Sequence, residues 1–411
     1  MEQERYELPD GWEWKQIGEL FEVTSSKRVH QKDWKSEGIP FYRTRELVEL
    51  SKNGHVDNTL FISNEMFNEF KNKYGIPSEN DLLVSGVGTI GIPYIVPKNN
   101  QFYFKDGNII WFKNKKNTNA KFIYFLYHSP FVIRQINAFP VGTTVKTYTI
   151  VNAKNTWIPL PPLPEQRRIA DKLDAVLGRI DDAIRLSQGN LASLDDLFAS
   201  LLQQAFDPLG KASEETRYEL PDGWKWKKLE TCGRFVSGYT PKKNELSEQG
   251  IPYFKVSDMN SSGNEIFLKY TSSFIQSPNR TLPSNTIVYP KNGGAIFTNK
   301  KRILFTESVV DLNTAGFIPL KTFCLKYIWF FFKKIDFKNF SKGSALPTID
   351  LDRIKNIFIP LPPLPEQRRI ADKLDALSGK IAMQKRAIEE KLDELNHLKN
   401  SVLDAAFRGR L

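Results

Sequence analysis

IPLPPLPEQRRIADKLDA occupies residues 158–175 and recurs letter for letter at 359–376. A second pair of segments, RYELPDGWEWK at 5–15 and RYELPDGWKWK at 217–227, differs at a single position. The stretches between these four segments scarcely match. The repeat is too long for a solenoid unit, which spans roughly 20 to 50 residues. The sequence therefore predicts a duplicated domain, whose two copies share their boundary segments and differ in their interiors.

Each copy of the 18-letter segment is predicted to open a long helix. Its second proline run is followed by Glu-Gln, and both proline and an acidic residue are favoured in a first helical turn. Further on, apolar residues recur in alternating steps of four and three, the spacing of a coiled-coil seam. We expect helices over 163–209 and 364–411 that pair with each other, antiparallel because the two halves are related by an internal pseudo-two-fold. The alternative is two separate helices, each packed on its own module.

Within each half, strand signals come first and helical signals follow. We expect strands at 38–43 and 81–85 in the first half, and at 250–255 and 285–289 in the second. An aromatic helix follows in each half, and we expect its rings to form core rather than to stack on bases. The fold class is therefore mixed α/β, with modules at 1–162 and 210–363, a central long helix at 163–209 and a distal one at 364–411.

The charge of the chain is concentrated outside the predicted helices. The net charge is +11, yet the two helices hold 15 Lys and Arg against 16 Asp and Glu, which leaves 43 against 31 for the rest. Basic modules suit contact with nucleic-acid phosphates, whereas the helices suit contact with protein. A basic protein with no polyanionic partner is the alternative. Two cysteines, no signal-peptide pattern and no long apolar run predict a soluble cytoplasmic protein with no membrane association.

Two sequence patterns resemble catalytic or cofactor-binding motifs, but each lacks a feature that such a site requires. The stretch 86–91, GVGTIG, fits a dinucleotide-binding fingerprint, but strand-like residues follow it where a helix is required, so we expect a hairpin turn. A PD…EWK pattern at 9–15 imitates a nuclease site, but the second copy replaces its glutamate with Lys225. The four histidines and two cysteines lack the spacing of metal ligands. We therefore expect no catalytic residues and no metal site.

LPDGW near the start of each half, GIP before an aromatic strand, and IPLPPLPEQRRIADKLD opening a long helix resemble one family. It is the specificity subunit of type I restriction–modification systems, and the resemblance covers essentially the whole chain. The second half also carries a GxTP-like turn at Gly238–Pro241, whereas the first half departs from it with Thr24–Lys27.

The resemblance implies two target-recognition domains, each reading half of a bipartite site in double-stranded DNA, joined by an antiparallel helical spacer. It also implies a non-catalytic subunit that docks with two modification (methyltransferase) subunits and with restriction (motor and nuclease) subunits. S-adenosylmethionine, ATP and Mg²⁺ would then belong to those partners, and this chain would hold no cofactor. Two alternatives stay open: a coiled-coil scaffold that does not bind DNA, and a solitary or silent specificity subunit without an active restriction partner.

Basic and polar residues in the modules are the candidates for DNA contact, because bases and phosphates are read by such side chains. In the first module they are Lys27, Arg28, Arg43, Arg45, Thr143, Thr144 and Lys146. In the second they are Tyr239, Lys242, Lys243, Lys255, Lys291, Lys300, Lys301 and Arg302. Docking and spacing are assigned to the helix starts, at Pro164, Glu165, Gln166, Arg167, Pro365, Glu366, Gln367 and Arg368.

The long helix between the modules predicts the gap between half-sites. Two modules meet the same face of B-DNA only when their half-sites lie about one helical turn apart, roughly 34 Å. Inserting four residues near Gln188 adds ~6 Å of helix. We expect this insertion to lengthen the preferred gap by one or two base pairs and to leave both half-sites unchanged.

Overall fold

The computed structural model describes residues 5–98, 100–115, 118–139, 146–207, 219–343 and 346–411. Its contacts divide the chain into two units. Unit 1 comprises residues 1–188 and 389–411, and unit 2 comprises residues 189–388. Each long helix contributes residues to both units. Thr143, Thr144 and the linker at 211–216 lie outside the described residues.

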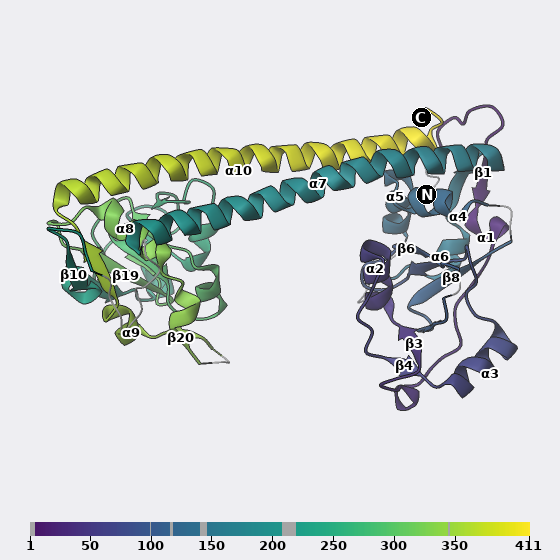
Figure 1. Cartoon of the computed structure of the whole chain (residues 1–411), viewed down its shortest axis with the longest axis horizontal. Helices are drawn as coiled ribbons and strands as arrows, with labels where there is room; N and C mark the ends of the chain where they lie inside the picture. Colours follow the sequence, from purple (N-terminus) through teal and green to yellow (C-terminus); the bar gives the residue numbers. More distant parts are fainter. Residues whose placement is uncertain (1–4, 99, 116–117, 140–145, 208–218, 344–345) are drawn as a thin grey trace. The chain divides into compact units, whose positions relative to one another are not determined.

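Unit 1 is built on a four-stranded antiparallel sheet in the order β2 (Phe21–Thr24), β8 (Ile109–Asn114), β5 (Leu82–Ser85), β6 (Pro93–Ile95). A smaller sheet has the order β4 (Phe61–Ile62), β3 (Ile39–Tyr42), β7 (Tyr103–Phe104). The helices before the long one are α1 (Ile17–Leu20), α2 (Thr44–Asn53), α3 (Asn64–Tyr74), α4 (Ala120–Tyr127), α5 (Pro130–Ala138) and α6 (Ile150–Lys154). Figure 1 shows α4 and α5 beside the first part of α7 (Leu163–Phe206).

Unit 2 repeats this plan with different loops. Its main sheet has the order β11 (Gly233–Ser237), β19 (Thr314–Pro319), β16 (Ile287–Pro290), β17 (Arg302–Leu304), β14 (Phe267–Leu268). A second sheet has the order β12 (Leu246–Ser247), β15 (Phe274–Ile275), β13 (Ile251–Phe254), β18 (Val309–Val310). The remaining elements are β20 (Ser341–Lys342), β21 (Thr348–Ile349), α8 (Leu325–Lys334), α9 (Leu351–Lys355) and the long α10 (Leu364–Phe407).

In each half, the two boundary segments that the copies share pair with each other as strands. In unit 1, β1 (Glu13–Gln16) is antiparallel to β9 (Trp157–Leu160), and in unit 2, β10 (Lys225–Lys228) is antiparallel to β22 (Phe358–Leu361). The prolines that follow β9 and β22 have no N–H to continue the ladder, so each strand stops where the long helix begins. The repeated segments therefore hold the start and the end of each module together, next to the first turn of the long helix.

Both long helices are 44 residues long, and they pair antiparallel. In unit 1, Lys399 of α10 donates to Asp181 of α7 at 2.6 Å. In unit 2, Lys385 of α10 forms an ion pair with Asp195 of α7. Between these pairs the residue number rises along one helix by the amount it falls along the other, as antiparallel pairing requires. The predicted antiparallel pair is therefore confirmed, and the alternative of two separate helices is excluded.

The helices also enter the module cores. In unit 1, Ile169 and Leu173 of α7 and Phe407 of α10 are buried with the aromatic face of α4. In unit 2, Phe206 of α7 and Leu374 of α10 are buried with α8. The aromatic rings of α4 and α8 are mostly buried, as predicted for core. Burial of one such side chain contributes about 1.5–3 kcal/mol, so each unit depends on both helices.

Candidate nucleic-acid interface

A turn after β5 forms a fixed junction in unit 1. Gly86 N donates to Asn108 O at 2.8 Å, and Gly86 O accepts from Tyr148 N at 2.8 Å. The next residue, Val87, forms a β-bridge with Thr147. The turn then leads into β6, which pairs antiparallel with β5, so the GVGTIG stretch is the predicted hairpin and not a dinucleotide-binding loop.

Unit 2 has the same junction after β16. Lys291 N donates to Asn313 O at 2.7 Å, Lys291 O accepts from Ile349 N at 3.0 Å, and Asn292 forms a β-bridge with Thr348. These are the backbone contacts that Gly86 and Val87 make in unit 1. The two modules thus hold a loop in the same way and present different side chains on it, Gly-Val in one and Lys-Asn in the other.

The junction of unit 2 lies in a cluster of basic and amide groups. Arg280 Nη2 donates to Gly238 O at 3.1 Å, and its guanidinium lies 5.4 Å from the centroid of the Tyr239 ring. Burial, together with the charge of Arg280, lowers the pKa of Lys291. Asn292 Nδ2 donates to Asn313 Oδ1 at 3.3 Å. The structure therefore brings together Tyr239 and Lys291, which were predicted from the sequence, and Arg280 and Asn292, which were not.

Lys255 lies at the end of β13. Its ammonium is 5.8 Å from the centroid of the Tyr253 ring, and its backbone N–H donates to Asp258 Oδ2 at 2.7 Å. Lys242 and Lys243 are exposed at a short 3₁₀ turn. Lys300 donates to the side chain of Asn260. These lysines present charge at the surface of unit 2 and remain predictions for DNA contact.

Two predicted residues of unit 2 lie in its interior. Lys301 is fully buried, and its ammonium donates to Ile335 O at 2.6 Å. Burial, together with the charge of Lys333, lowers the pKa of Lys301 to about 6. Arg302 is also buried and donates to the carbonyls of Lys301 and Met259. Neither side chain offers a surface donor to a phosphate, so the expectation that Lys301 and Arg302 contact DNA is corrected.

In unit 1, several predicted cations already have partners. Arg28 Nε lies 3.0 Å from Asp106 Oδ2. Arg43 binds Glu46 through Nε at 3.1 Å and Nη2 at 2.6 Å. Burial alone would raise the pKa of Glu46, but the hydrogen bonds from Arg43 lower it overall. Removal of Arg43 therefore also leaves a buried carboxylate unpaired, so loss of DNA binding in that variant would not by itself identify a base contact.

The other predicted residues of unit 1 are surface groups. Lys27 is exposed, and its ammonium lies 5.5 Å from the centroid of the Tyr74 ring. Arg45 is exposed on the first turn of α2. Lys146 is exposed, and its ammonium donates to Asn137 Oδ1 at 2.6 Å. Lys27 and Lys146 extend from the two segments that flank the junction at Gly86.

The start of each long helix is tied to its own module by a glutamine. Gln166 is buried; its Oε1 accepts from Asn119 N at 2.9 Å and its Nε2 donates to Pro161 O at 2.9 Å. Gln367 repeats this pattern with Cys324 N at 3.0 Å and Pro362 O at 2.9 Å. Both side chains are occupied inside the protein, so the assignment of Gln166 and Gln367 to partner docking is corrected to a structural role.

The neighbouring residues of the helix starts remain accessible. Glu165 forms an ion pair with Arg168 at 2.7 Å, and the hydrogen bond from Arg168 lowers the pKa of Glu165. Glu366 and Arg369 form the same pair at 2.6 Å. The prolines and arginines at the remaining predicted positions are exposed, namely Pro164, Arg167, Pro365 and Arg368.

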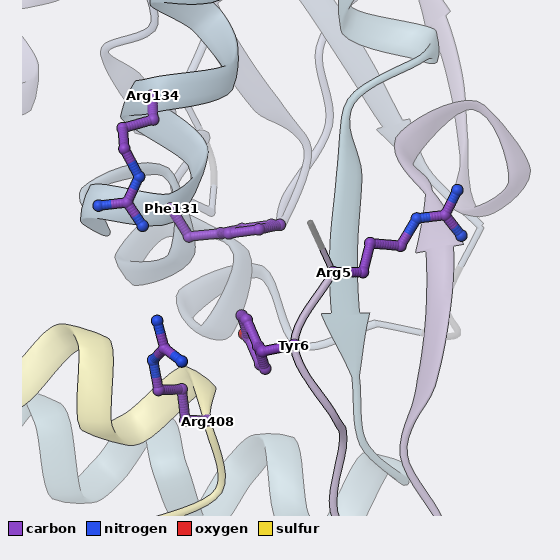
Figure 2. A pocket seen from close by; sticks show the side chains of 5 residues that line it. All are labelled: Arg5, Tyr6, Phe131, Arg134 and Arg408. Carbon is purple, nitrogen blue, oxygen red and sulfur yellow. The ribbon is translucent and has the colours of Figure 1, made fainter. Parts of the chain in front are cut away.

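A basic pocket of about 450 Å³ lies in unit 1 where α5 meets the end of α10. Figure 2 shows Arg134 and Arg408 pointing toward one space beside Phe131 and Tyr6, whereas Arg5 points away. Tyr6 Oη donates to Phe407 O at 2.6 Å, and the Arg408 guanidinium lies 4.5 Å from the Tyr6 ring centroid. The pocket therefore lies between the repeated segment at 5–15 and the end of α10.

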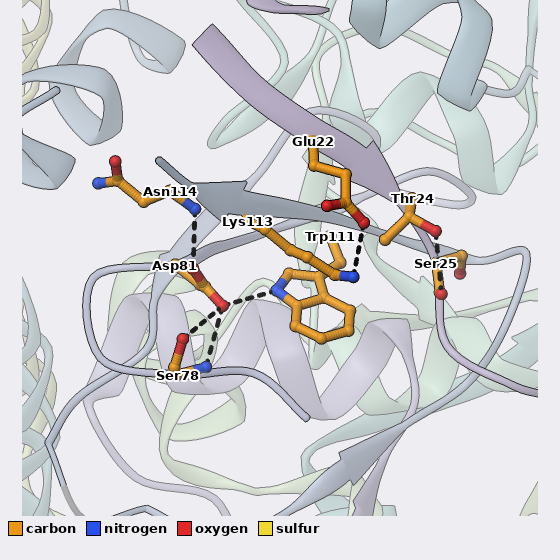
Figure 3. A network of polar contacts seen from close by, with 8 residues as sticks. All are labelled: Glu22, Thr24, Ser25, Ser78, Asp81, Trp111, Lys113 and Asn114. Atoms are coloured by element: carbon orange, nitrogen blue, oxygen red, sulfur yellow. Dashed lines mark hydrogen bonds and ion pairs between the residues drawn. The ribbon is translucent and has the colours of Figure 1, made fainter. Parts of the chain in front are cut away.

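The buried carboxylate of Asp81 has a structural role. It accepts hydrogen bonds from Trp111 Nε1 at 2.8 Å, from Ser78 N at 2.9 Å and from Asn114 N at 2.9 Å (Figure 3). Such a fully bonded carboxylate fixes the loop before β5 to β8. Among the residues that the structure describes, no group of three His, Cys, Asp or Glu could hold a metal ion.

Within the described ranges, no helix combines the length and the apolar character needed to cross a bilayer.

Comparison with known proteins gives one family. The model of the type I restriction modification DNA specificity domain matches residues 9–192 and again 221–394. A Haemophilus influenzae chain described as a type I restriction enzyme specificity subunit is 33% identical over 177 residues, which cover 42% of this chain and 43% of that one. The EcoBI specificity subunit of Escherichia coli is 26% identical over 70% of this chain and 65% of its own length. Both matches thus span less than two thirds of those relatives.

A solved structure has the same fold. Its title refers to the structural basis of complex assembly and conformational transition of the type I R-M system. That structure superposes on this chain with a TM-score of 0.79. The match covers 99% of this chain and all of that chain at 22% identity. Two copies of one domain, closed by the same paired strands and long helices, agree with the double match of the family model. The chain therefore belongs to the family of type I restriction–modification DNA specificity subunits.

Proposed function

We propose that this chain selects the DNA sequence for a type I restriction–modification complex, with each unit reading one half of a split site in double-stranded DNA. The observation that carries this proposal is the shared junction with different side chains, Gly86-Val87 in unit 1 and Lys291-Asn292 in unit 2. Two modules with identical loops would read the same bases in both half-sites. Here the loops share their main-chain contacts but carry different side chains, so the two modules read different bases.

The chemistry of the reaction belongs to other subunits under this proposal. Two modification subunits bind S-adenosylmethionine and methylate adenine, and restriction subunits use ATP and Mg²⁺. The surfaces that support docking are the exposed parts of the helix starts, including Arg167 and Arg368. This chain acts as a non-catalytic DNA-binding subunit, and the domain boundaries at 162/163, 209/210 and 363/364 remain part of the proposal.

The test is co-expression with the modification subunit of the same system, followed by genome-wide mapping of N6-methyladenine. We expect a single split motif, methylated on both strands across a fixed unspecific gap. A purified stable complex that methylates no such motif would overturn the proposal and favour a silent subunit or a scaffold. Binding of the purified complex to DNA at several salt concentrations then separates those two, since a DNA-binding chain shows strong salt dependence.

A further inference from the structure

A pocket of about 340 Å³ lies beside the junction of unit 1. Val87 and Thr147, the two residues of the β-bridge, both line it. Ile109, the first residue of β8, lines it together with Val151 of α6, whose side chain is 64% exposed. An aliphatic side chain of that exposure, next to a hollow with other aliphatic walls, indicates a surface for an apolar group.

Most polar side chains of the pocket are already occupied within unit 1. Ser25 Oγ donates to Ile109 O at 2.7 Å and accepts from Gly107 N at 3.2 Å. Tyr148 Oη bonds Thr156 Oγ1 at 2.6 Å, and Thr149 Oγ1 accepts from Asn152 N at 3.1 Å. A polar ligand group would lose its water here and gain few partners in return, which costs free energy. The pocket therefore favours an apolar group.

Three aliphatic positions of this pocket are polar in unit 2, whereas Ile110 and Ile150 correspond to the apolar Ala315 and Leu351. The shared junction places Asn292 where Val87 lies. Ile109 faces Ser85 in the β5–β8 ladder, and Thr314 faces Pro290 in the corresponding β16–β19 ladder. Asp352 of α9 takes the place of Val151, because α6 and α9 stand at the same distance before the repeated segment. The aliphatic side chains of Val87, Ile109 and Val151 are thus specific to unit 1 and are not required by the shared fold.

Exposed cations flank this pocket. Lys27 follows Ser25 by two residues, and Lys146 directly precedes Thr147; both are exposed. Cations beside an apolar hollow suit a groove of double-stranded DNA, because lysines contact phosphates while the hollow meets a base edge. The C5-methyl group of thymine is the apolar group that B-DNA displays in its major groove.

We propose that this pocket of unit 1 receives the C5-methyl group of one thymine in the half-site that unit 1 reads, with Val87 as the specificity-determining contact. The inference rests on the proposed function and names the base chemistry that unit 1 selects. It predicts a thymine in one half-site whose methyl group, rather than its hydrogen-bonding edge, determines affinity.

The experiment removes only that methyl group. In duplexes that carry the mapped split motif, each thymine of both half-sites is replaced in turn by deoxyuridine, and binding by the full chain in complex with its modification subunit is measured at fixed salt. At one position we expect about a fourfold loss of affinity, the factor that burial of one methyl-sized group supports. The variant Val87→Ala should reduce this loss to less than about twofold.

The chain offers a matched control at the equivalent position of unit 2. Asn292→Val should leave the fourfold effect of that methyl group in place, and in Val87→Ala the unchanged recognition of the other half-site shows that the variant is folded. If no thymine shows a methyl dependence, or if Val87→Ala keeps it in full, the pocket proposal is wrong although the split motif stands. If the wild-type complex has no split motif, the proposed function itself fails.

Discussion

At the scale of single residues, Gln166 and Gln367 show how a repeated segment can be important without facing a partner. Each amide is buried and joins the main chain before the long helix to the start of the aromatic helix of the same unit. A buried side chain with two such bonds leaves unpaired main-chain groups when it is shortened. The recurrence of the letters alone could not distinguish this role from docking.

We expect Gln166→Ala to destabilise unit 1 by about 2–3 kcal/mol, because Asn119 N and Pro161 O lose their partner in the interior. Chemical denaturation of the full chain, followed by hydrogen exchange of the α4 amides, measures the loss and locates it. Arg167→Ala is the matched control, since that side chain is exposed and its removal should change stability by less than about 0.5 kcal/mol. Equal effects of the two substitutions would contradict the structural role of Gln166.

Lys301 predicts a pH dependence of stability. Its pKa is lowered to about 6 in the folded chain, below the ordinary value of lysine, so the unfolded chain binds more protons between pH 6 and pH 10. Folding must therefore release this proton, which costs stability at the low end of the window, and this cost disappears as the pH rises to about 10. Relative to the wild type, Lys301→Met should gain on the order of 5 kcal/mol more at pH 6 than at pH 10.

Hydrogen exchange of the β17 and α8 amides across that pH range is the measurement. Lys300→Met is the control, because Lys300 is its neighbour in sequence and is only partly buried. A stability difference between Lys301→Met and the wild type that stays constant from pH 6 to pH 10 would show that Lys301 keeps its charge in the folded chain.

At the scale of elements, the long helices are held in register by cross-helix ion pairs as well as by apolar contacts. Asp181→Lys should place a lysine opposite Lys399 and destabilise unit 1 by about 0.5–1 kcal/mol, and Lys399→Asp in the same chain should restore the loss. A double-mutant cycle by chemical denaturation at low salt measures this coupling. Asp182→Lys is the control, because Asp182 pairs with Arg185 on its own helix and should show no coupling with Lys399.

The helices could be predicted from the sequence because their apolar period is local and repeats over many turns. The hairpin at Gly86 could be predicted because strand-like residues follow it. The pairing of β1 with β9 could not, since the two strands are far apart in sequence and no local pattern encodes their register. Burial of Lys301 was equally hidden: the run Lys300–Arg302 looks uniformly basic, and only packing against Ile335 and Phe337 separates its members.

The candidate surface for DNA contact was the least predictable part. Arg280 lies in a loop without a recognisable motif, and it reaches Tyr239 only through the fold of unit 2. Asn292 is a candidate for DNA contact because its β-bridge matches that of Val87, and this match is seen only in the structure. Charge was a guide to the modules as a whole, but it did not distinguish an exposed lysine from a buried one.

At the scale of the whole molecule, both long helices supply residues to both units, so a change in their length must be matched. Asp181 and Asp195 are as far apart along α7 as Lys385 and Lys399 are along α10. Four residues inserted after Gln188 alone break this match, so the expectation that this single insertion lengthens the gap is corrected: both helices must be lengthened together. The same insertion after both Gln188 and Ile388 keeps both pairs and adds ~6 Å to each helix.

We therefore expect the matched insertion to lengthen the unspecific gap of the methylated motif by one or two base pairs with both half-sites intact. The single insertion after Gln188 should lower stability and methylation together, because only one ion pair and its neighbouring apolar contacts can form. Mapping of N6-methyladenine for both variants checks this. An unchanged gap in the matched variant would show that the length of the helices does not set the distance between the half-sites.

The junction at Gly86 and Lys291 has a consequence for how such a protein changes over generations. The β-bridges of Val87 and Asn292 join main-chain groups only, so they do not depend on the side chains at these two positions, whereas a Cβ at Gly86 would lie 2.8 Å from Tyr148 O. Under the proposed function, a single substitution at Val87 or Asn292 would therefore alter the preferred base while the architecture persists. Each half could then change its target independently of the other.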